Sequence, residues 1–256
     1  MSPRSGLLLC ASIAGCARPV VRDEAPVAPP HEASPSATTA QFAPVAVVEL
    51  FTSEGCSSCP PADDVFTELA READPRVALL AFHVDIWDDL GHPDPFASSE
   101  HTRRQWAYSR SLGQRGVFTP QAIVSGAISH VGSEGRAIRA SIAASLRRAA
   151  VATITPTITR DGERLRLAWT TEGHTSAAKL LIALTEDGLS TRVKAGENAG
   201  KTLVHGAVVR ATLERDGAAG TATLMAAGVA MDRAKVVWVL TDEASGSVRG
   251  AAWRRP

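Results

Sequence analysis

Two cysteines three positions apart are the residues best placed to do chemistry in this sequence. Cys56 and Cys59 enclose two serines, and Pro60 and Pro61 follow directly. Proline suits the first position of a helix, because it has no N–H to satisfy and its φ is already helical. A helix therefore begins beside Cys59, and the dipole and free N–H groups at its N-terminus favour a thiolate at Cys56. The pattern predicts thiol–disulfide exchange, with Cys56 as the exposed, attacking thiolate and Cys59 as the resolving thiol.

Three other uses of a cysteine pair compete with redox catalysis: a structural disulfide, part of a zinc site, and two buried thiols. A zinc site needs about four ligands, and the other two cysteines, Cys10 and Cys16, belong to the leader described below. A structural disulfide usually closes a longer loop, because its entropic benefit grows with the length enclosed. We therefore expect an oxidoreductase without a resident metal or cofactor. The alternatives are a copper-delivery protein that uses both cysteines with a histidine such as His83, and a binding module whose disulfide is only structural.

Four stretches after residue 45 carry a family resemblance. They read VVELFTSEGCSSCPPAD, AFHVDIWDDLGHPDPFASSEHTRRQWAYSRSLG, GVFTPQAIVSG and VKAGENAGKTLVHGAVVR. These stretches resemble a family of secreted bacterial proteins known as domain of unknown function 1223, within the thioredoxin-like superfamily. The resemblance implies a thioredoxin-like domain, a β-rich domain after it, and a redox role.

The resemblance also assigns a role to Thr119 and Pro120, which precede a predicted strand. By itself, an X-Pro bond at the start of a strand is usually trans. In the superfamily, a cis-proline lies opposite the cysteine pair, blocks metal binding and presents the backbone of the preceding residue to the substrate. The resemblance therefore implies that these two residues shape a substrate groove. The chain departs from the superfamily at Gly55, where an aromatic residue is usual, and in the position of its strand carboxylate, Glu49.

Accessory residues are expected near the ends of the first two predicted strands. In open α/β sheets, ligands gather outside the C-terminal ends of the strands. His83, Asp85 and Trp87 occupy that position in the second strand, and Glu49 lies in the first. Taken singly, each of them is more often a packed or solvated residue, so they are accessory candidates only.

Hydrophobic periodicity predicts two halves of different character. The first half reads as strand, helix, strand, helix, two strands and helix, and it predicts a thioredoxin-like α/β domain over residues 45–150. From residue 151, apolar and polar residues alternate in seven short segments with glycine-rich turns between them. This pattern predicts an appended all-β, sandwich-like domain over residues 151–256. His92 and His101 are predicted to lie at the surface.

The start of the chain has the features of an export signal. Residues 1–16 combine Arg4 with a short apolar core and end in Ile-Ala-Gly-Cys, which resembles the bacterial lipoprotein box. We expect Cys16 to be lipidated, with an ordinary secretory signal as the alternative. Residues 17–44 are rich in Ala and Pro and cannot bury enough apolar surface to fold, which predicts a disordered tether.

Composition limits the partners. The chain of 256 residues has 27 basic and 27 acidic residues, so its charge gives no reason to expect nucleic acid. We expect an exported protein in the periplasm or cell envelope, held to a membrane through Cys16. Its partners would be the thiols or disulfides of exported proteins, or another redox protein.

Overall fold

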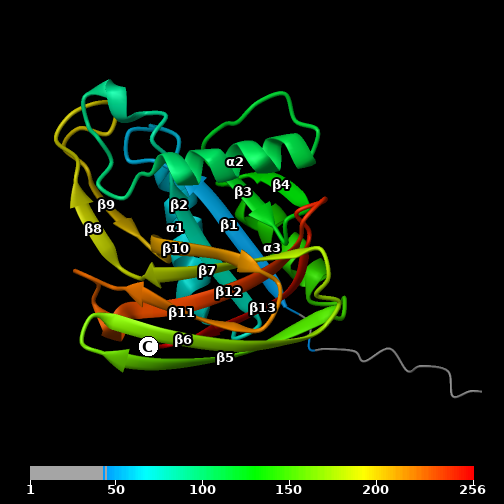
Figure 1. Ribbon diagram of the computed structural model, residues 1–256. Helices are drawn as coiled ribbons and strands as arrows, with labels where there is room; N and C mark the ends of the chain where they lie inside the picture. The colour runs from blue at the N-terminus through cyan, green and yellow to red at the C-terminus, as the bar shows by residue number, and fades with distance from the viewer. Residues whose placement is uncertain (1–42, 44) are drawn as a thin grey trace, which may run out of the picture. The chain divides into compact units, whose positions relative to one another are not determined.

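One mixed sheet of eight strands is the framework of the protein (Figure 1). The computed structural model describes residue 43 and residues 45–256. The strand order is β13-β12-β7-β10-β2-β1-β3-β4. In chain order these strands are β1 (Ala46–Thr52), β2 (Val77–His83), β3 (Gln121–Val124), β4 (Ile128–Val131), β7 (Ala178–Glu186), β10 (Val208–Asp216), β12 (Ala234–Asp242) and β13 (Val248–Arg254).

Two smaller sheets and three α-helices complete the described part of the chain. The three-stranded sheet consists of β5 (Ala152–Asp161), β6 (Arg164–Gly173) and β11 (Gly220–Met225), and a hairpin consists of β8 (Leu189–Arg192) and β9 (Thr202–His205). The α-helices are α1 (Pro60–Glu72), α2 (Ser99–Ser111) and α3 (Gly135–Ser145), with short 3-10 turns η1 (Asp88–Leu90) and η2 (Met231–Arg233).

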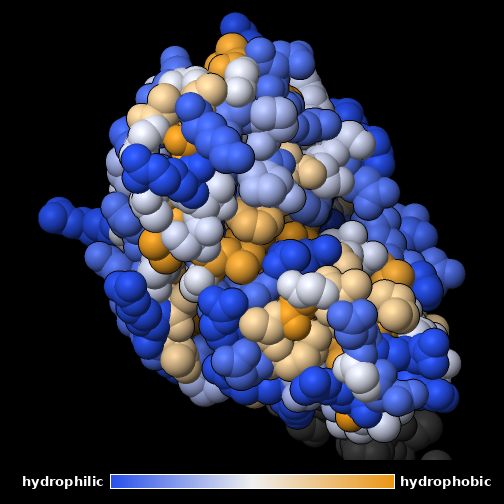
Figure 2. Space-filling view, turned by 90° about the vertical axis from the view of Figure 1, so that its left-hand side faces the viewer, coloured by the Kyte–Doolittle hydropathy of each residue, from blue (hydrophilic) through white to orange (hydrophobic). Residues whose placement is uncertain are grey.

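The large sheet is covered on both faces, which explains why β1 is buried along its whole length. On one face, α1 and α3 pack against β1 through a core that includes Phe66, Ile138 and Leu50. In the second half of the chain, the three-stranded sheet packs on β7 and β12 in a second core around Trp238. A third core includes Tyr108 of α2 together with residues of β1, β2, β7 and β12. The side of the protein that carries β8 and β9 is mostly hydrophilic, with hydrophobic residues gathered near its middle (Figure 2).

The predicted fold class, an α/β thioredoxin-like domain with an appended β-sandwich-like domain, is wrong. The described chain is predominantly β, and its main sheet contains strands from both before and after residue 150. The junction is β10, which pairs in parallel with β2 through Val208 and Ala81 and in antiparallel fashion with β7. Alternation in the sequence identifies strands, but it does not identify partners so distant in the chain. Four strands of the β-rich half, β7, β10, β12 and β13, therefore extend the first sheet, and β5, β6 and β11 form the smaller sheet that packs on it.

Several local expectations also need correction. The predicted strand over 202–214 is two strands, β9 and β10, because the chain turns at Gly206 and Ala207, where Ala207 has a positive φ of 53°. The strand β8 was not predicted. His92 and His101 are both buried, since the segments around them fold back onto the ends of β1 and β2.

The predictions for residues 1–16 and 17–44, including lipidation of Cys16, lie outside the described residues. Within the described residues, no helix combines the length and apolar character needed to cross a membrane.

Candidate functional site

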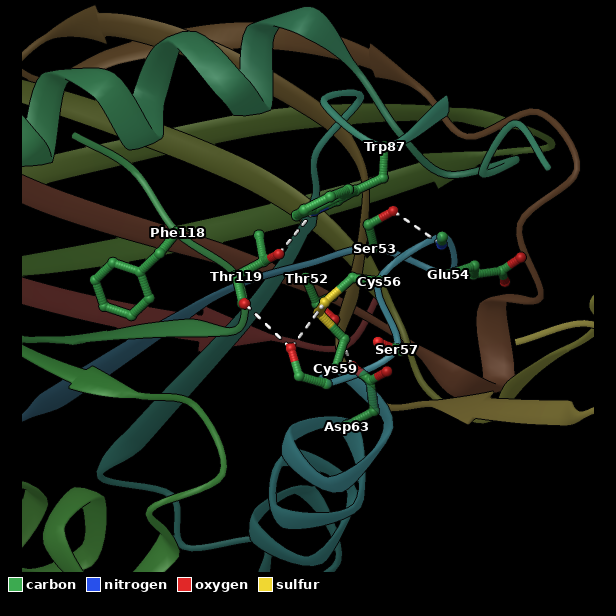
Figure 3. Close-up of a disulfide and its surroundings, with 12 residues drawn as sticks. Thr52, Ser53, Glu54, Cys56, Ser57, Cys59, Asp63, Trp87, Phe118 and Thr119 are labelled. Carbon is green, nitrogen blue, oxygen red and sulfur yellow. Dashed lines mark hydrogen bonds between the residues drawn. A yellow bond between two sulfur atoms is a disulfide. The ribbon is translucent and has the colours of Figure 1, made fainter. Parts of the chain in front are cut away.

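A disulfide joins Cys56 and Cys59 at the N-terminus of α1 (Figure 3). The loop that carries it connects β1 to α1 and is closed by backbone hydrogen bonds from Cys56 N to Ser53 O and from Cys59 N to Cys56 O, both at 3.2 Å. The predicted exposure of Cys56 is wrong for this disulfide form: Cys56 is 3% exposed and Cys59 is 0% exposed. The exposed part of the loop is the pair of intervening serines.

Thr119 and Pro120 lie beside the disulfide, and the peptide bond between them is cis. The Ser58 hydroxyl lies 3.3 Å from Cys56 Sγ and donates to the carbonyl oxygen of Thr119 at 3.4 Å. From the other side, Trp87 Nε1 donates to the Thr119 hydroxyl at 2.7 Å. Figure 3 shows Trp87 on the side of the sulfur atoms opposite α1, with Thr119 beside the sulfur atoms. The structure therefore brings three of the predicted site residues, Thr119, Pro120 and Trp87, to the cysteine pair.

A loop from the second half of the chain closes over the same turn. It lies between β8 and β9, and the fully buried Asn198 donates from Nδ2 to the carbonyl oxygens of Glu54 and Cys56, both at 2.9 Å. The carboxylate of Glu197 accepts from the Ser57 N–H at 3.2 Å. Lys201 Nζ donates to Asn198 Oδ1 at 2.8 Å, which holds the amide in this orientation.

Glu54, two residues before the first cysteine, is the centre of a buried group of acids and histidines. Its two carboxylate oxygens are 2.8 Å from His92 Nε2 and 3.1 Å from His205 Nε2. Burial alone would raise the pKa of Glu54, but the hydrogen bonds from His205 and His92 outweigh burial and lower it. Glu54 is therefore ionised at neutral pH although it is fully buried.

His205 also faces Asp63 of α1. The distance from His205 Nδ1 to Asp63 Oδ2 is 3.6 Å, and the other oxygen of Asp63 accepts from the Thr52 hydroxyl at 3.0 Å. Burial alone would lower the pKa of His205, but its contacts with Asp63 and Glu54 outweigh burial and raise the pKa to about 9. An imidazolium with a carboxylate on each side thus lies beneath the cysteine turn.

His83, predicted as an accessory residue, joins this buried group from β2. Its Nδ1 is 2.7 Å from Asp94 Oδ2, and that oxygen also accepts from the Glu54 N–H at 2.9 Å. Burial would raise the pKa of Asp94, but the charge and hydrogen bond of His83 outweigh it and lower the pKa. His83 and His205 are in edge-to-face contact, with ring centroids 4.8 Å apart. His83 therefore lies behind the cysteine loop.

The other two predicted accessory residues have partners elsewhere. Glu49 is fully buried and accepts hydrogen bonds from Arg104 at 2.6 and 3.0 Å and from the Tyr108 hydroxyl at 2.5 Å, which ties α2 to β1. Asp85 accepts from the Thr102 hydroxyl at 2.5 Å. The structure thus gives Glu49 and Asp85 contacts that hold α2 in place.

Among residues 45–256, no group of three or more His, Cys, Asp or Glu side chains has the arrangement of a metal site. The histidines and acids of the buried group are instead paired with one another.

Sequence reasoning missed the residues that surround the cysteine turn most closely. Glu54 could have been noticed from its place two residues before Cys56, and Asp63 from its place one helical turn after Cys59. His205, Glu197 and Asn198 lie in the fourth stretch of the family resemblance, but nothing in the sequence connects them to the cysteine turn, because each is at least 140 positions from its partner there.

Comparison with known proteins identifies the family. The family model described as "Protein of unknown function (DUF1223)" matches residues 47–240, so the chain belongs to that family. A crystal structure of a protein from Agrobacterium tumefaciens is similar at 29% identity and a TM-score of 0.62, with 84% of this chain and 95% of that chain covered. HBP35 of Porphyromonas gingivalis, at 16% identity and a TM-score of 0.61, shares the fold over 84% of this chain and 76% of that chain. No curated protein matches the chain.

Proposed function

We propose that this member of the DUF1223 family is a thiol–disulfide oxidoreductase that uses Cys56 and Cys59. The observation that carries the proposal is the disulfide at the N-terminus of α1, with the Ser58 hydroxyl between Cys56 Sγ and the Thr119 carbonyl. A disulfide that encloses only two residues gains little from loop closure, because that entropy grows with loop length. Redox chemistry accounts for the pair better than stabilisation does.

The exchange proceeds in two steps. In the reduced protein, the Cys56 thiolate attacks one sulfur of a substrate disulfide, and the other substrate sulfur leaves as a thiolate. Cys59 then loses its proton and attacks Cys56 Sγ, which breaks the mixed disulfide and releases the second substrate sulfur. Two electrons pass from the cysteine pair to the substrate. The Cys59 proton passes to one substrate thiolate, and the other substrate thiolate takes from solvent the proton that Cys56 gave up when its thiolate formed. The same steps in reverse oxidise a substrate dithiol.

The helix terminus and Ser58 support the first step. The N–H groups at the start of α1 and the helix dipole stabilise a thiolate at Cys56. In the reduced protein, the Ser58 hydroxyl, which lies 3.3 Å from Cys56 Sγ in the disulfide form, turns its proton from the Thr119 carbonyl to that thiolate. Thr119 then presents its backbone to the incoming sulfur compound beside the same hydroxyl.

Asp63 and His205 support the second step. Cys59 is fully buried, so its proton needs a nearby acceptor. Asp63 lies one helical turn after Cys59, which places the two side chains on one face of α1 with Cβ atoms about 5–6 Å apart. Asp63 Oδ2 has no hydrogen-bond partner among the described residues and faces His205 Nδ1. This oxygen is the acceptor that we assign to the Cys59 proton.

The cellular setting is part of the same proposal. Residues 1–16 have the features of a lipoprotein-type leader, and we place the protein in the cell envelope with Cys16 as its membrane anchor. Its partners there are thiols or disulfides of exported proteins. Cys16→Ser is expected to move the folded protein from the membrane fraction to the soluble exported fraction, as measured by fractionation.

Trapping of the mixed disulfide tests the function. Cys59→Ser removes the resolving thiol, so covalent adducts between Cys56 and exported substrate proteins accumulate and are released by a reductant. Cys56→Ser is the matched control, because it retains the buried thiol of Cys59 and removes the attacking one. Non-reducing electrophoresis followed by mass spectrometry of the released proteins measures both variants. Equal adduct formation by the two variants, or none by either, contradicts the proposal.

A further inference from the structure

We propose that Glu197 makes the redox site selective for cationic sulfur compounds over anionic ones, and that Asn198 holds Glu197 in the position where it does so. The inference deepens the proposed exchange at Cys56 and rests on it. It also gives a role to the Gly-Glu-Asn-Ala-Gly segment over 196–200, which lies more than 130 residues beyond the cysteine motif.

Asn198 anchors the loop to the cysteine turn. Its side chain is fully buried and donates to the backbone carbonyl oxygens of Glu54 and Cys56, on either side of Gly55. Its own carbonyl accepts from Lys201. An amide that satisfies two buried backbone acceptors in one turn fixes the loop against that turn, because the loss of either bond leaves a buried oxygen unpaired.

Glu197 is thereby placed at the reactive end of the turn. It is exposed, and its carboxylate accepts from the Ser57 N–H at 3.2 Å, so a negative charge lies one peptide unit from Cys56. A charged sulfur compound that reaches Cys56 is therefore subject to the field of this carboxylate. A cationic compound is attracted and an anionic compound is repelled.

The acids that lie beneath the cysteine turn are buried, whereas Glu197 is exposed. Glu54 is paired with His92 and His205 beneath the turn, and Asp63 is buried beside α1. The loop also contains two cations, Lys194 and Lys201, and Lys201 donates to the Asn198 carbonyl oxygen.

The test compares two small disulfides of opposite charge, cystamine and dithiodipropionate. The full-length chain carries Cys10→Ser, Cys16→Ser and Cys59→Ser, which leaves Cys56 as its single thiol among the four cysteines of the sequence. Cys56 attacks one sulfur of the reagent, and the other leaves as a thiol, so the mixed disulfide accumulates and is counted by mass spectrometry. The ratio of the two rates is the readout, because any change in the fraction of thiolate cancels from it.

The expected result is a preference for cystamine that depends on Glu197. Two unit charges roughly 6 Å apart in water interact with about 0.7 kcal/mol, which changes a rate of reaction about threefold. Attraction speeds the reaction with cystamine and repulsion slows that with dithiodipropionate, so the ratio of the two rates changes by about tenfold. Glu197→Gln keeps an acceptor for Ser57 but removes the charge, and it lowers the ratio by about that factor at low ionic strength. The difference shrinks when salt is added. Asn198→Ala lowers the ratio as well, although it removes no charge.

Glu172→Gln is the matched control, because it removes an exposed carboxylate on β6, in the three-stranded sheet, and leaves the ratio unchanged. A ratio in Glu197→Gln equal to that of the parent overturns the inference. A different result contradicts the proposed function, namely that Cys59→Ser forms no covalent adducts with exported proteins. Any accessible thiol reacts with the small disulfides, so the two failures are distinguishable.

Discussion

The backbone of Gly55 lies directly against Trp87, and this contact explains why glycine precedes the first cysteine. A Cβ added at Gly55 would lie 2.9 Å from Trp87 Cβ and 3.0 Å from the Trp87 carbonyl oxygen. Trp87 in turn holds the Thr119 hydroxyl beside the disulfide. The absence of a side chain at residue 55 is therefore what allows the Trp87 segment to approach the cysteine turn.

We predict that Gly55→Ala destabilises the protein by about 1–3 kcal/mol, the usual range for forcing an extra carbon into a packed contact. The substitution also pushes Trp87 away from Thr119, so it slows the reaction of Cys56 in the reduced protein. Urea unfolding and the rate of thiol exchange measure the two effects. Gly116→Ala is the control, since a Cβ there meets no atom within 4 Å. Equal stability of the two variants would contradict this account of Gly55.

At the scale of elements, the buried acids and histidines join three separate parts of the chain. His205 ends β9, Asp63 lies in the first turns of α1, and Glu54 lies in the loop after β1. Charges buried this deeply stabilise a fold only while they remain paired. The protonation state of His205 therefore controls whether β9 and α1 are held together by opposite charges.

We predict that stability falls as the pH rises from about 6.5 to 9. The pKa of His205 is raised from its ordinary value of 6.5 to about 9 in the folded protein. The stability that protonated His205 contributes is fully present below pH 6.5 and is lost as the pH rises through 9. Between these values the folded protein still binds the proton and the unfolded chain does not, so each rise in pH favours unfolding. The loss amounts to about 3 kcal/mol. Urea unfolding of the disulfide form across this pH range measures it.

Glu54 and Asp94 act in the opposite direction. Because their pKa values are lowered in the folded protein, the stability that they contribute is present above their unfolded pKa values and is lost at acid pH.

His205→Gln is expected to lower stability at pH 6 and to flatten the alkaline decline. His174→Gln, at an exposed histidine, leaves the decline as it is in the parent. An unchanged alkaline slope in His205→Gln would exclude His205 as its cause.

At the scale of the whole molecule, the two halves of the sequence share one sheet and one site. The Ala81 N–H of β2 donates to Ala207 O at 2.8 Å, just where β10 begins. The core beneath α2 combines residues of β1 and β2 with residues of β7 and β12. The cysteine turn itself accepts hydrogen bonds from Asn198.

We predict that a fragment of residues 1–150 does not fold alone. It would expose the edge of β2 and one wall of the core under α2, and it would leave Glu54 buried without His205. Circular dichroism during urea titration should show no cooperative transition for the fragment, whereas the full chain shows a single one. A cooperative transition in the isolated fragment would show that the first half is an independent domain.

The sequence by itself determined the local features of this protein. The two prolines after Cys59 placed the start of α1, and alternation from residue 151 identified most of the strands, because helix starts and strand periodicity depend on residues a few positions apart. The cysteine spacing alone placed both cysteines in one turn.

Only the tertiary structure decided how these features combine. Whether β10 pairs with β2 or closes a separate sheet depends on burial and hydrogen bonding summed over the chain, and no pattern near Val208 encodes its partner Ala81. That pairing brings the β8–β9 loop to the cysteine turn. The Glu197 carboxylate then accepts from the N–H of Ser57, the residue after Cys56. The residues that surround the disulfide are set by strand partners far away in sequence, and those partners are chosen by the burial of the whole sheet.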